Sequence, residues 1–368
     1  MVVFLFFVIS ILVLLSFQYS ENIILVKSRP TYLIYSISLS ILFFSIYLFL
    51  LSKQNLFQSD MIAYFNNLQS IHYLVSFNTI SDIFRQIDFE KGFIILQVIV
   101  GFCTNNAQTY GLIMYTLILL LPLIAASYYF GLESVPFIML HYVFFNIFNT
   151  VSLIVIRQGL AIGILLISLT VYLRGHKKIA TMLMLISAQF HSTVYIMLVA
   201  FIIIELFKIN LKFLLYVWGF TSLLYVMSWN QNIIQYLPFN SKFLVNYTGS
   251  LWNEQSTIYG QSPNSIKYLL FSAIFLLFIL FLKKFFLIDD NNMSFFVKVY
   301  VIWNTVFLLF GFVAFSSRIA LYSWILFPFI VFYAFWSNRV LKTYYPVLII
   351  IWIISGLISL PILGWTAI

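Results

Sequence analysis

Long apolar runs separated by short polar stretches follow one another along most of the chain. A membrane-spanning helix needs about 20 apolar residues, and many of these runs meet or approach that length. We therefore predict one all-α, polytopic membrane domain over residues 1–368, with about 12 membrane segments, some of them short or re-entrant. Barrel strands fit poorly, because they alternate polar and apolar residues over about ten positions. The segments are expected to begin near Met1, Thr31, Thr109, Ser134, Ile156, Ile179, Ser192, Phe213, Tyr268, Phe295, Ile319 and Pro346.

Composition supports the membrane prediction and narrows the function. Hydrophobic residues make up 63% of the chain and charged residues 8%, against about a quarter in an ordinary soluble domain. The net charge is +9, but the basic residues stand singly between apolar runs, which argues against a nucleic-acid surface. Cys103 is the single cysteine, so no internal disulfide is expected. Residues 1–18 lack a basic n-region and a small-residue cleavage site, which favours a first membrane helix over a removed signal peptide.

Short basic loops set the expected orientation. The positive-inside rule places these loops on the cytoplasmic side of the membrane. Because successive loops lie on alternate sides of the membrane, two longer segments, about 52–108 and about 229–267, are expected on the outer face together with loop 314–318. The basic loops are Lys27 with Arg29, residues 174–178, Lys208 with Lys212, Lys283 with Lys284, and Arg339 with Lys342.

The stretch between basic loops 174–178 and 206–212 requires a re-entrant pair of helices. If both loops are cytoplasmic, the chain between them must cross the membrane twice or turn back inside it. The stretch reaches only about 40 Å as a helix, which is too short for two comfortable spans. We expect two short helices that meet at Gln189-Phe190-His191-Ser192-Thr193, with His191 at the tip of the turn.

Arg157, His191 and Arg318 are three ionisable residues that stand at or beside apolar segments. Such a residue costs about 2.5–3.5 kcal/mol in the membrane centre, so it is by default a candidate for function. The predicted topology brings all three to the outer face. A guanidinium there suits phosphate oxygens, whereas the plain alternative is an arginine that reaches to lipid headgroups. The alternative for His191 is a structural role.

The outer segment 52–108 supplies the candidate acids. Asp60 and Glu90 flank apolar stretches that could dock on the helix bundle, whereas Asp82 and Asp88 have the character of loop or capping residues. Asp60 and Tyr64 are four residues apart and would share a helix face. An outer carboxylate could deprotonate a sugar hydroxyl or stabilise positive charge at an anomeric carbon, although helix capping competes for Asp60.

Metal and nucleotide chemistry find no support in the sequence. No second His or Cys stands at metal-ligand spacing, so we predict no metal and no cofactor. No Gly-rich phosphate loop or Rossmann fingerprint is present, so a nucleotide-linked donor is not expected. A donor used at an outward-facing site would have to arrive already activated and anchored in the membrane.

These motifs resemble the EpsG-like branch of Wzy-type polysaccharide polymerases. The resemblance rests on an Arg-Gln-x-x-Ala helix start at Arg157-Gln158, a basic inner turn at 174–178, and Ala188-Gln189-Phe190-His191-Ser192 about 30 residues on. Asp60 with Tyr64 is similar to the family's Asp-x-x-x-Tyr segment, and Phe89 to Gly92 is similar to its acidic-x-Gly element. Lys91 stands where proline is common, and Asp60 lacks a neighbouring glycine. The resemblance covers most of residues 55–205, with an Arg before a late span (Arg318, with Tyr322) beyond it.

The resemblance implies an O-antigen or exopolysaccharide polymerase with a GT-C-like glycosyltransferase architecture. Such a protein joins undecaprenyl-pyrophosphate-linked repeat units on the periplasmic face of the bacterial inner membrane, without a metal. Its partners would be lipid-linked glycans, membrane lipids and a chain-length regulator protein.

The roles that follow are hypotheses for individual side chains. Arg157, Arg318 and Gln158 would bind the pyrophosphate, and His191 would activate the acceptor hydroxyl or add a phosphate contact. Asp60 or Glu90 is the alternative base, and Tyr64, Arg85 and Tyr322 are further candidates for substrate contact. The alternatives are a flippase of lipid-linked oligosaccharide, a membrane acyltransferase and an O-antigen ligase.

Overall fold

The computed structural model describes residues 29–52, 60–75, 79–234, 263–288, 290–313, 315–341 and 345–360. All regular structure in these ranges is helical, which confirms the predicted helical class. The chain divides into two compact units, residues 1–194 with 344–353 and residues 195–343 with 354–368, and each is described by itself. The expectation of a single membrane domain concerns the whole chain and stays a prediction.

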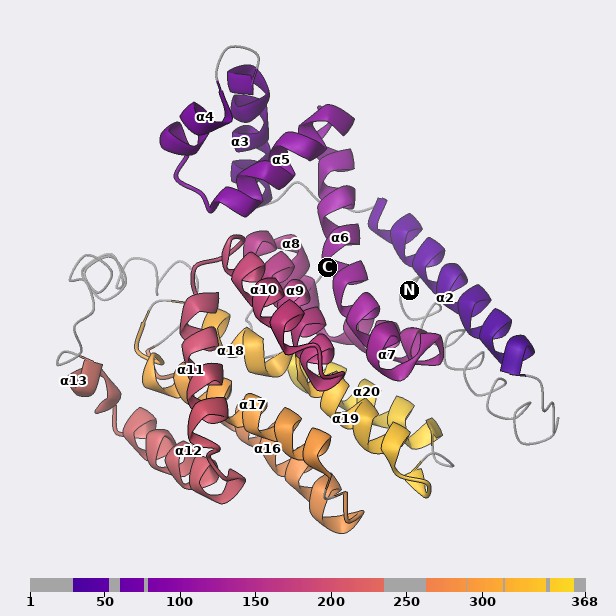
Figure 1. The fold of residues 1–368 in the computed structure, drawn as a ribbon, viewed down its shortest axis with the longest axis vertical. Helices are drawn as coiled ribbons and strands as arrows, with labels where there is room; N and C mark the ends of the chain where they lie inside the picture. The colour runs from indigo at the N-terminus through magenta and orange to yellow at the C-terminus, as the bar shows by residue number, and fades with distance from the viewer. Residues whose placement is uncertain are drawn as a thin grey trace. The chain divides into compact units, whose positions relative to one another are not determined.

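Unit 1 holds the N-terminal helices (Figure 1). Its central pair is α9 and α10, and α9 also packs on α6. Helices α3, α4 and α5 form a group in which α3 contacts both of the others, and α3 also contacts α6. The elements are α2 (Arg29–Ser52), α3 (Asp60–Val75), α4 (Ile80–Gln86), α5 (Lys91–Cys103), α6 (Ala107–Phe130), η1 (Leu132–Ser134), α7 (Val135–Phe144), α8 (Asn146–Leu153), α9 (Ile156–Leu173) and α10 (Lys177–Ala188).

Unit 2 is built around α17, which contacts α12, α13, α16, α18 and α19. The elements are α11 (Val194–Phe207, in this unit from Tyr195), α12 (Leu211–Val226), α13 (Asn230–Ile234), α16 (Ile266–Phe285), α17 (Asn291–Leu309), α18 (Ser316–Trp324) and α19 (Phe327–Ser337). The last helix, α20 (Tyr345–Ser359), is divided between the two units.

A buried polar network fixes the centre of unit 2. The Asn304 carbonyl accepts a hydrogen bond from Trp218 Nε1 at 2.8 Å, and its amide donates to the hydroxyls of Ser272 at 2.9 Å and Ser323 at 3.0 Å. Trp324 Nε1 also donates to the Ser272 hydroxyl at 2.9 Å. Because unpaired polar groups in such a core are costly, these pairings specify how α12, α16, α17 and α18 pack.

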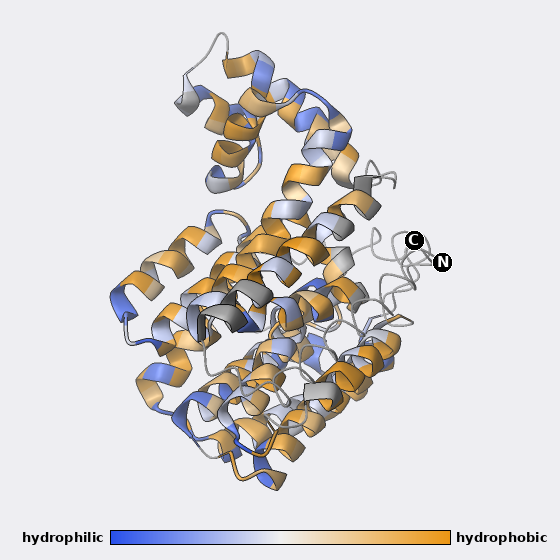
Figure 2. Ribbon diagram, turned by 90° about the vertical axis from the view of Figure 1, so that its right-hand side faces the viewer, coloured by the Kyte–Doolittle hydropathy of each residue, from blue (hydrophilic) through white to orange (hydrophobic). Residues whose placement is uncertain are grey.

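The described helices support the membrane prediction. Five segments are long and apolar enough to cross a membrane, namely Ala107–Phe130, Ile156–Leu173, Ile266–Phe285, Asn291–Leu309 and Ser316–Ser337. Figure 2 shows the colours of hydrophobic residues along much of the helical ribbon. Shorter apolar helices of 10–17 residues include Lys91–Cys103 and Val194–Phe207. The expected first segment at Met1 and most of segment 229–267 lie outside the described residues, so the number of about 12 segments stays a prediction.

Two glycines set how closely α9 packs. A methyl group at Gly159 would lie 2.8 Å from a Val151 side-chain carbon and 2.9 Å from the Val151 carbonyl oxygen. A methyl group at Gly163 would lie 2.5 Å from Leu121 Cβ. These two positions form a small-x-x-x-small pattern, which lets helix backbones approach closely in membrane proteins. The packing of α9 against α8 and α6 therefore places its first turn, which carries Arg157.

The chain reverses direction between α9 and α10, at the basic loop 174–178. Ser187 Oγ donates to the Ala161 carbonyl at 2.7 Å, and Ser168 Oγ donates to the Ala180 carbonyl at 2.6 Å. These bonds join the start of one helix to the end of the other, so the helices are antiparallel. The turn at residues 189–193 consequently returns to the end of α9 that carries Arg157. The prediction of short helices on either side of this turn is confirmed, since α10 has 12 residues and α11 has 14.

Candidate active site

Arg157 lies in the first turn of α9 and is the centre of the candidate site. Its Nη1 atom forms an ion pair with Glu90 Oε2 at 2.5 Å, and the two side chains are 24% and 19% exposed. Its Nε atom is buried and has no hydrogen-bond partner among the described residues. A charge held at this level of exposure is costly unless it is paired, so Glu90 accounts for the position of the guanidinium.

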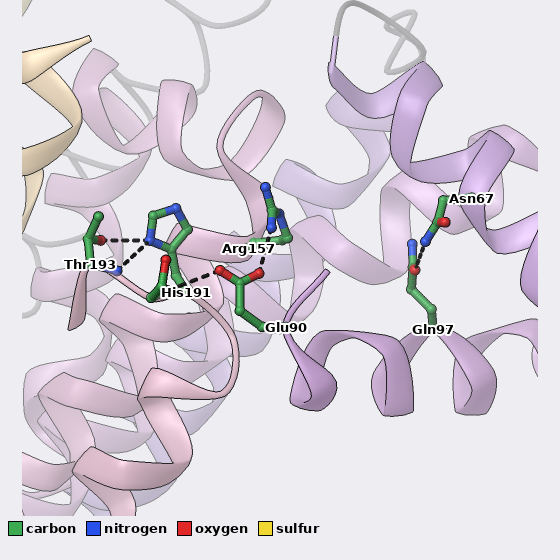
Figure 3. A network of polar contacts seen from close by, with 7 residues as sticks. Asn67, Glu90, Gln97, Arg157, His191 and Thr193 are labelled. Carbon is green, nitrogen blue, oxygen red and sulfur yellow. Dashed lines mark hydrogen bonds and ion pairs between the residues drawn. The ribbon is translucent and has the colours of Figure 1, made fainter. Parts of the chain in front are cut away.

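Glu90 connects Arg157 to the turn that carries His191. It is the N-cap residue of α5, and its backbone is extended there, with φ −62° and ψ 139°. Its second carboxylate oxygen, Oε1, accepts a hydrogen bond from the Ser192 backbone N–H at 3.0 Å. Figure 3 shows the carboxylate between the Arg157 guanidinium and this turn. Each oxygen of the carboxylate therefore has a donor on a different element.

The backbone of α5 reinforces this contact. The Gly92 N–H donates to the Gln189 carbonyl at 2.9 Å. A methyl group at Gly92 would lie 2.8 Å from the Gln189 carbonyl oxygen and 2.9 Å from Gln189 Cβ. Such distances are well inside ordinary contact, so glycine is the residue that allows this approach. Residues 90–92 are thus docked on the 189–193 turn by a side chain and by the backbone.

Aromatic rings cover the Arg157 guanidinium. Its Cζ atom lies 4.4 Å from the centroid of the Phe89 ring and 5.8 Å from that of Tyr64. Tyr64 is buried and packs against Phe89 and Phe93, with centroid distances of 5.9 Å and 5.5 Å. Cations gain from such ring faces, more so where water is excluded. The guanidinium is consequently held in a defined plane.

A polar network holds the backbone of Tyr64, the residue whose ring lies near Arg157. Gln97 on α5 is fully buried, and its Nε2 atom donates to the Tyr64 carbonyl at 2.9 Å and to the Tyr110 hydroxyl at 3.3 Å. Its Oε1 atom accepts from Asn67 Nδ2 at 2.5 Å (Figure 3). These contacts tie α3, α5 and α6 together.

His191 is half-buried at the tip of the turn. Its Nδ1 atom lies 2.6 Å from Thr193 Oγ1 and 3.4 Å from the Thr193 backbone nitrogen, whose N–H donates to it. A backbone N–H can only donate, so these contacts favour the neutral tautomer with its proton on Nε2. In that tautomer Nε2 is a hydrogen-bond donor.

Charge and burial act in opposite directions on Glu90. Burial tends to raise the pKa of its carboxyl, but the Arg157 guanidinium and the backbone N–H groups at Glu90 and Ser192 together hold that pKa below its ordinary value. Glu90 is therefore a carboxylate at neutral pH. Among the described residues no group of three His, Cys, Asp or Glu side chains could hold a metal ion.

Comparison with known protein families decides what kind of protein carries this geometry. A model of the EpsG family matches residues 37–364. The chain belongs to the EpsG family. The resemblance drawn from the Arg-Gln and Phe-His motifs is thereby confirmed. No protein of curated description and no solved structure matches the chain.

The apolar helices and the family together identify this chain as a membrane protein. Membership of the EpsG family is consistent with a polysaccharide polymerase in general. Of the residues predicted for the site, the structure of this EpsG protein brings Glu90 and Arg157 into contact and docks the His191 turn beside them. Tyr64 packs against the same guanidinium.

The structure shows no hydrogen bond or ion pair between the remaining unit 1 candidates that it describes and the Glu90 carboxylate. Gln158 is buried beside Arg157 in α9, and Arg85 is exposed in the last turn of α4. Asp60 begins α3, four residues before Tyr64 as expected, but its side chain is outside the described residues. Asp82 serves as the capping-box residue of α4, as predicted.

Arg318 and Tyr322 belong to unit 2. The Arg318 guanidinium lies over the Phe315 ring, with Cζ 4.6 Å from the centroid. Tyr322 is fully buried, and its ring packs near Trp303, so a substrate could reach it only if this core opened. The expected convergence of Arg157, His191 and Arg318 spans both units and stays a prediction.

Sequence reasoning missed the partners that organise the EpsG site. It ranked Glu90 as a candidate but did not pair it with Arg157, 67 residues away. It also missed Phe89, Gln97 and the Gly92 contact. The signal for Glu90 was present, because a half-buried arginine needs a carboxylate and segment 52–108 supplied few.

Proposed function

We propose that this EpsG family protein is a polymerase that joins undecaprenyl-pyrophosphate-linked oligosaccharide repeats into O-antigen or exopolysaccharide. We place it in the bacterial inner membrane, with its site on the periplasmic face and a GT-C-like arrangement of membrane helices. The growing glycan on its lipid carrier is the donor, and one new lipid-linked repeat is the acceptor. A chain-length regulator protein is its proposed partner.

The observation that carries the proposal is the half-buried Arg157 guanidinium beside His191's turn in a membrane protein of this family. A planar guanidinium pairs well with phosphate oxygens, and the pairing gains strength where water is excluded. In the proposed reaction Arg157, with Gln158 and Arg318, binds the pyrophosphate and stabilises it as the leaving group while the anomeric bond breaks.

His191 has two candidate roles, and its surroundings favour one of them. The tautomer with a proton on Nε2 supports a hydrogen bond from His191 to a phosphate oxygen. The other role, activation of the acceptor hydroxyl, needs Nε2 to be deprotonated. Asp60 remains a candidate base, whereas the contacts of Glu90 suit that role less well. Tyr64 and Arg85 remain proposed substrate contacts, and Tyr322 would join them only if its core opened.

Polysaccharide ladders test the function directly. A polymerase-deficient strain would carry the wild-type chain, Arg157→Ala, Arg318→Ala or His191→Ala at equal protein levels. We expect Arg157→Ala to leave mainly single repeats, and Arg339→Ala, the same change at an exposed residue, to give full ladders. Full-length ladders in all three site variants would refute the proposal.

Arg157→Lys gives a finer test of the phosphate role. Lysine keeps the charge but presents it as a point rather than a planar fork, so polymerisation should fall by about 10-fold or more. Wild-type ladders from this variant would reduce Arg157 to an interfacial anchor.

A further inference from the structure

Glu90 bridges the two elements that carry the proposed phosphate-binding side chains. One carboxylate oxygen holds Arg157 Nη1 at 2.5 Å, and the other holds the Ser192 N–H at 3.0 Å, next to His191. The two partners lie on α9 and on the turn after α10. Because one rigid carboxylate joins them, the distance between Arg157 and the turn depends on Glu90.

This geometry suits a general base poorly. A base needs an oxygen that can reach the proton it removes and a pKa near the working pH. Both oxygens of Glu90 already accept hydrogen bonds, and its pKa is below the ordinary carboxyl value, chiefly because Arg157 and backbone N–H groups outweigh burial.

The same segment holds the turn a second time. Gly92 donates its N–H to the Gln189 carbonyl at 2.9 Å, two residues after Glu90. The Arg157 guanidinium also rests on the ring of Phe89, the residue just before Glu90. Residues 89–92 therefore contact both the guanidinium and the turn, and they fix one relative to the other.

We propose that Glu90 is a positioning residue that sets the Arg157 guanidinium and the His191 turn for one pyrophosphate group. The inference rests on the proposed polymerase function. Glu90 itself touches no substrate in this assignment, and its effect on the donor passes through Arg157 and through the turn that carries His191. A misplacement of about 1 Å in such a site can lower the rate by about 100-fold.

Binding of undecaprenyl pyrophosphate without its glycan separates positioning from base catalysis. The Kd would be measured for the full-length purified protein in micelles, as wild type, Glu90→Gln, Arg157→Ala and the double variant. We expect Glu90→Gln to weaken binding about 10-fold, as for one charge-assisted hydrogen bond. In the Arg157→Ala background the same change should weaken binding clearly less, because only its route through the Ser192 N–H and the His191 turn remains.

Each other result has a definite meaning. An unchanged Kd with lost polymerisation would make Glu90 a base, and a tighter Kd would make it a competitor of phosphate. Equal weakening in both backgrounds would make it an independent contact, so each of these overturns the inference. If Arg157→Ala itself leaves the Kd unchanged, the phosphate role in the proposed function fails instead.

Two glycine variants test the same contact in case the Glu90 variant misfolds. Gly92→Ala keeps the carboxylate but pushes α5 from Gln189, so it should weaken binding as Glu90→Gln does. Gly101→Ala on the same helix is the matched control, since its methyl group would meet only Leu68 Cδ1 at 3.6 Å and His72 at 4.0 Å. A wild-type Kd for Gly92→Ala, at an unchanged unfolding temperature, would contradict the proposed docking.

Discussion

Gly163→Ala should destabilise unit 1, because α9 touches α6 at this position. The new methyl carbon would lie 2.5 Å from Leu121 Cβ and 2.9 Å from Leu121 Cδ1. A rotation of the leucine could move Cδ1, but Cβ is fixed to the backbone of α6. Relief therefore requires the helices to separate by about 1 Å to reach ordinary contact distance.

The magnitude follows from two opposing effects. Overpacking of a tight contact costs about 1–3 kcal/mol, and alanine gains about 0.5–1 kcal/mol over glycine inside a helix. The net loss is about 0–2.5 kcal/mol, with about 1.2 kcal/mol at the centre of that range, and the central value lowers the unfolding temperature by about 2–5 °C for a domain of this size.

Gly219→Ala is the matched control for this prediction. Gly219 lies in α12, and a methyl group there would meet nothing within 4 Å. This variant should be as stable as the wild type or slightly more stable. Thermal unfolding of both variants in the same detergent measures the difference.

The outcome that refutes the reasoning is simple to state. If Gly163→Ala unfolds at the same temperature as Gly219→Ala, or above it, close packing of α9 on α6 does not depend on the glycine. The placement of Arg157 by that packing would then lose its support.

Three further predictions concern polar contacts. The Glu90 carboxyl has a lowered pKa, so its pairing with Arg157 stabilises the fold above the ordinary carboxyl pKa and is lost as the pH falls through the lower folded value. Glu90→Gln should therefore unfold at a lower temperature than the wild type at pH 7. The difference between the two unfolding temperatures should become smaller as the pH is taken below 4.5. A difference that does not change with pH would contradict this prediction. Ser187→Ala removes the 2.7 Å bond to the Ala161 carbonyl and should cost about 0.6 kcal/mol, seen as a small fall in unfolding temperature, whereas a rise would count against the bond. Asn304→Leu removes the partner of the Trp218 indole N–H and one partner from each of two serine hydroxyls, so it should cost about 1–3 kcal/mol in the same assay. An unchanged unfolding temperature would show that the network is dispensable.

The parts of the fold that sequence could predict are those that membrane insertion dictates. Arginine and lysine stay out of apolar spans, so Arg157 and the 174–178 loop mark the two ends of α9, which runs from Ile156 to Leu173. The length of the stretch up to the next basic loop then forced two short helices and a turn at 189–193. Each of these predictions used a rule that acts locally along the chain, and the structure confirms the helices.

Contacts between distant segments could not be predicted in the same way. Glu90 meets Arg157 because α5 begins with an extended residue and because Gly92 lets its backbone touch Gln189. Neither condition is visible in hydropathy, and Asp60 ranked equally with Glu90 among the acids of the same segment. The sequence alone could predict that a half-buried arginine needs a carboxylate beside it. Only the fold shows which acid supplies that carboxylate.

The structure brings some of the candidate site residues together and leaves Arg318 in the other unit, and this difference has a physical origin. Glu90, Arg157 and the His191 turn lie within one compact unit, where short-range packing and hydrogen bonds determine their distances. Arg318 belongs to the other unit, and its guanidinium is placed by the Phe315 ring of its own helix start. A diphosphate has enough oxygens for two guanidinium groups, and the proposed function assigns Arg318 as the second. Binding of undecaprenyl pyrophosphate should then depend on Arg318 as well as on Arg157, and a Kd unaffected by Arg318→Ala would leave the whole phosphate site within unit 1.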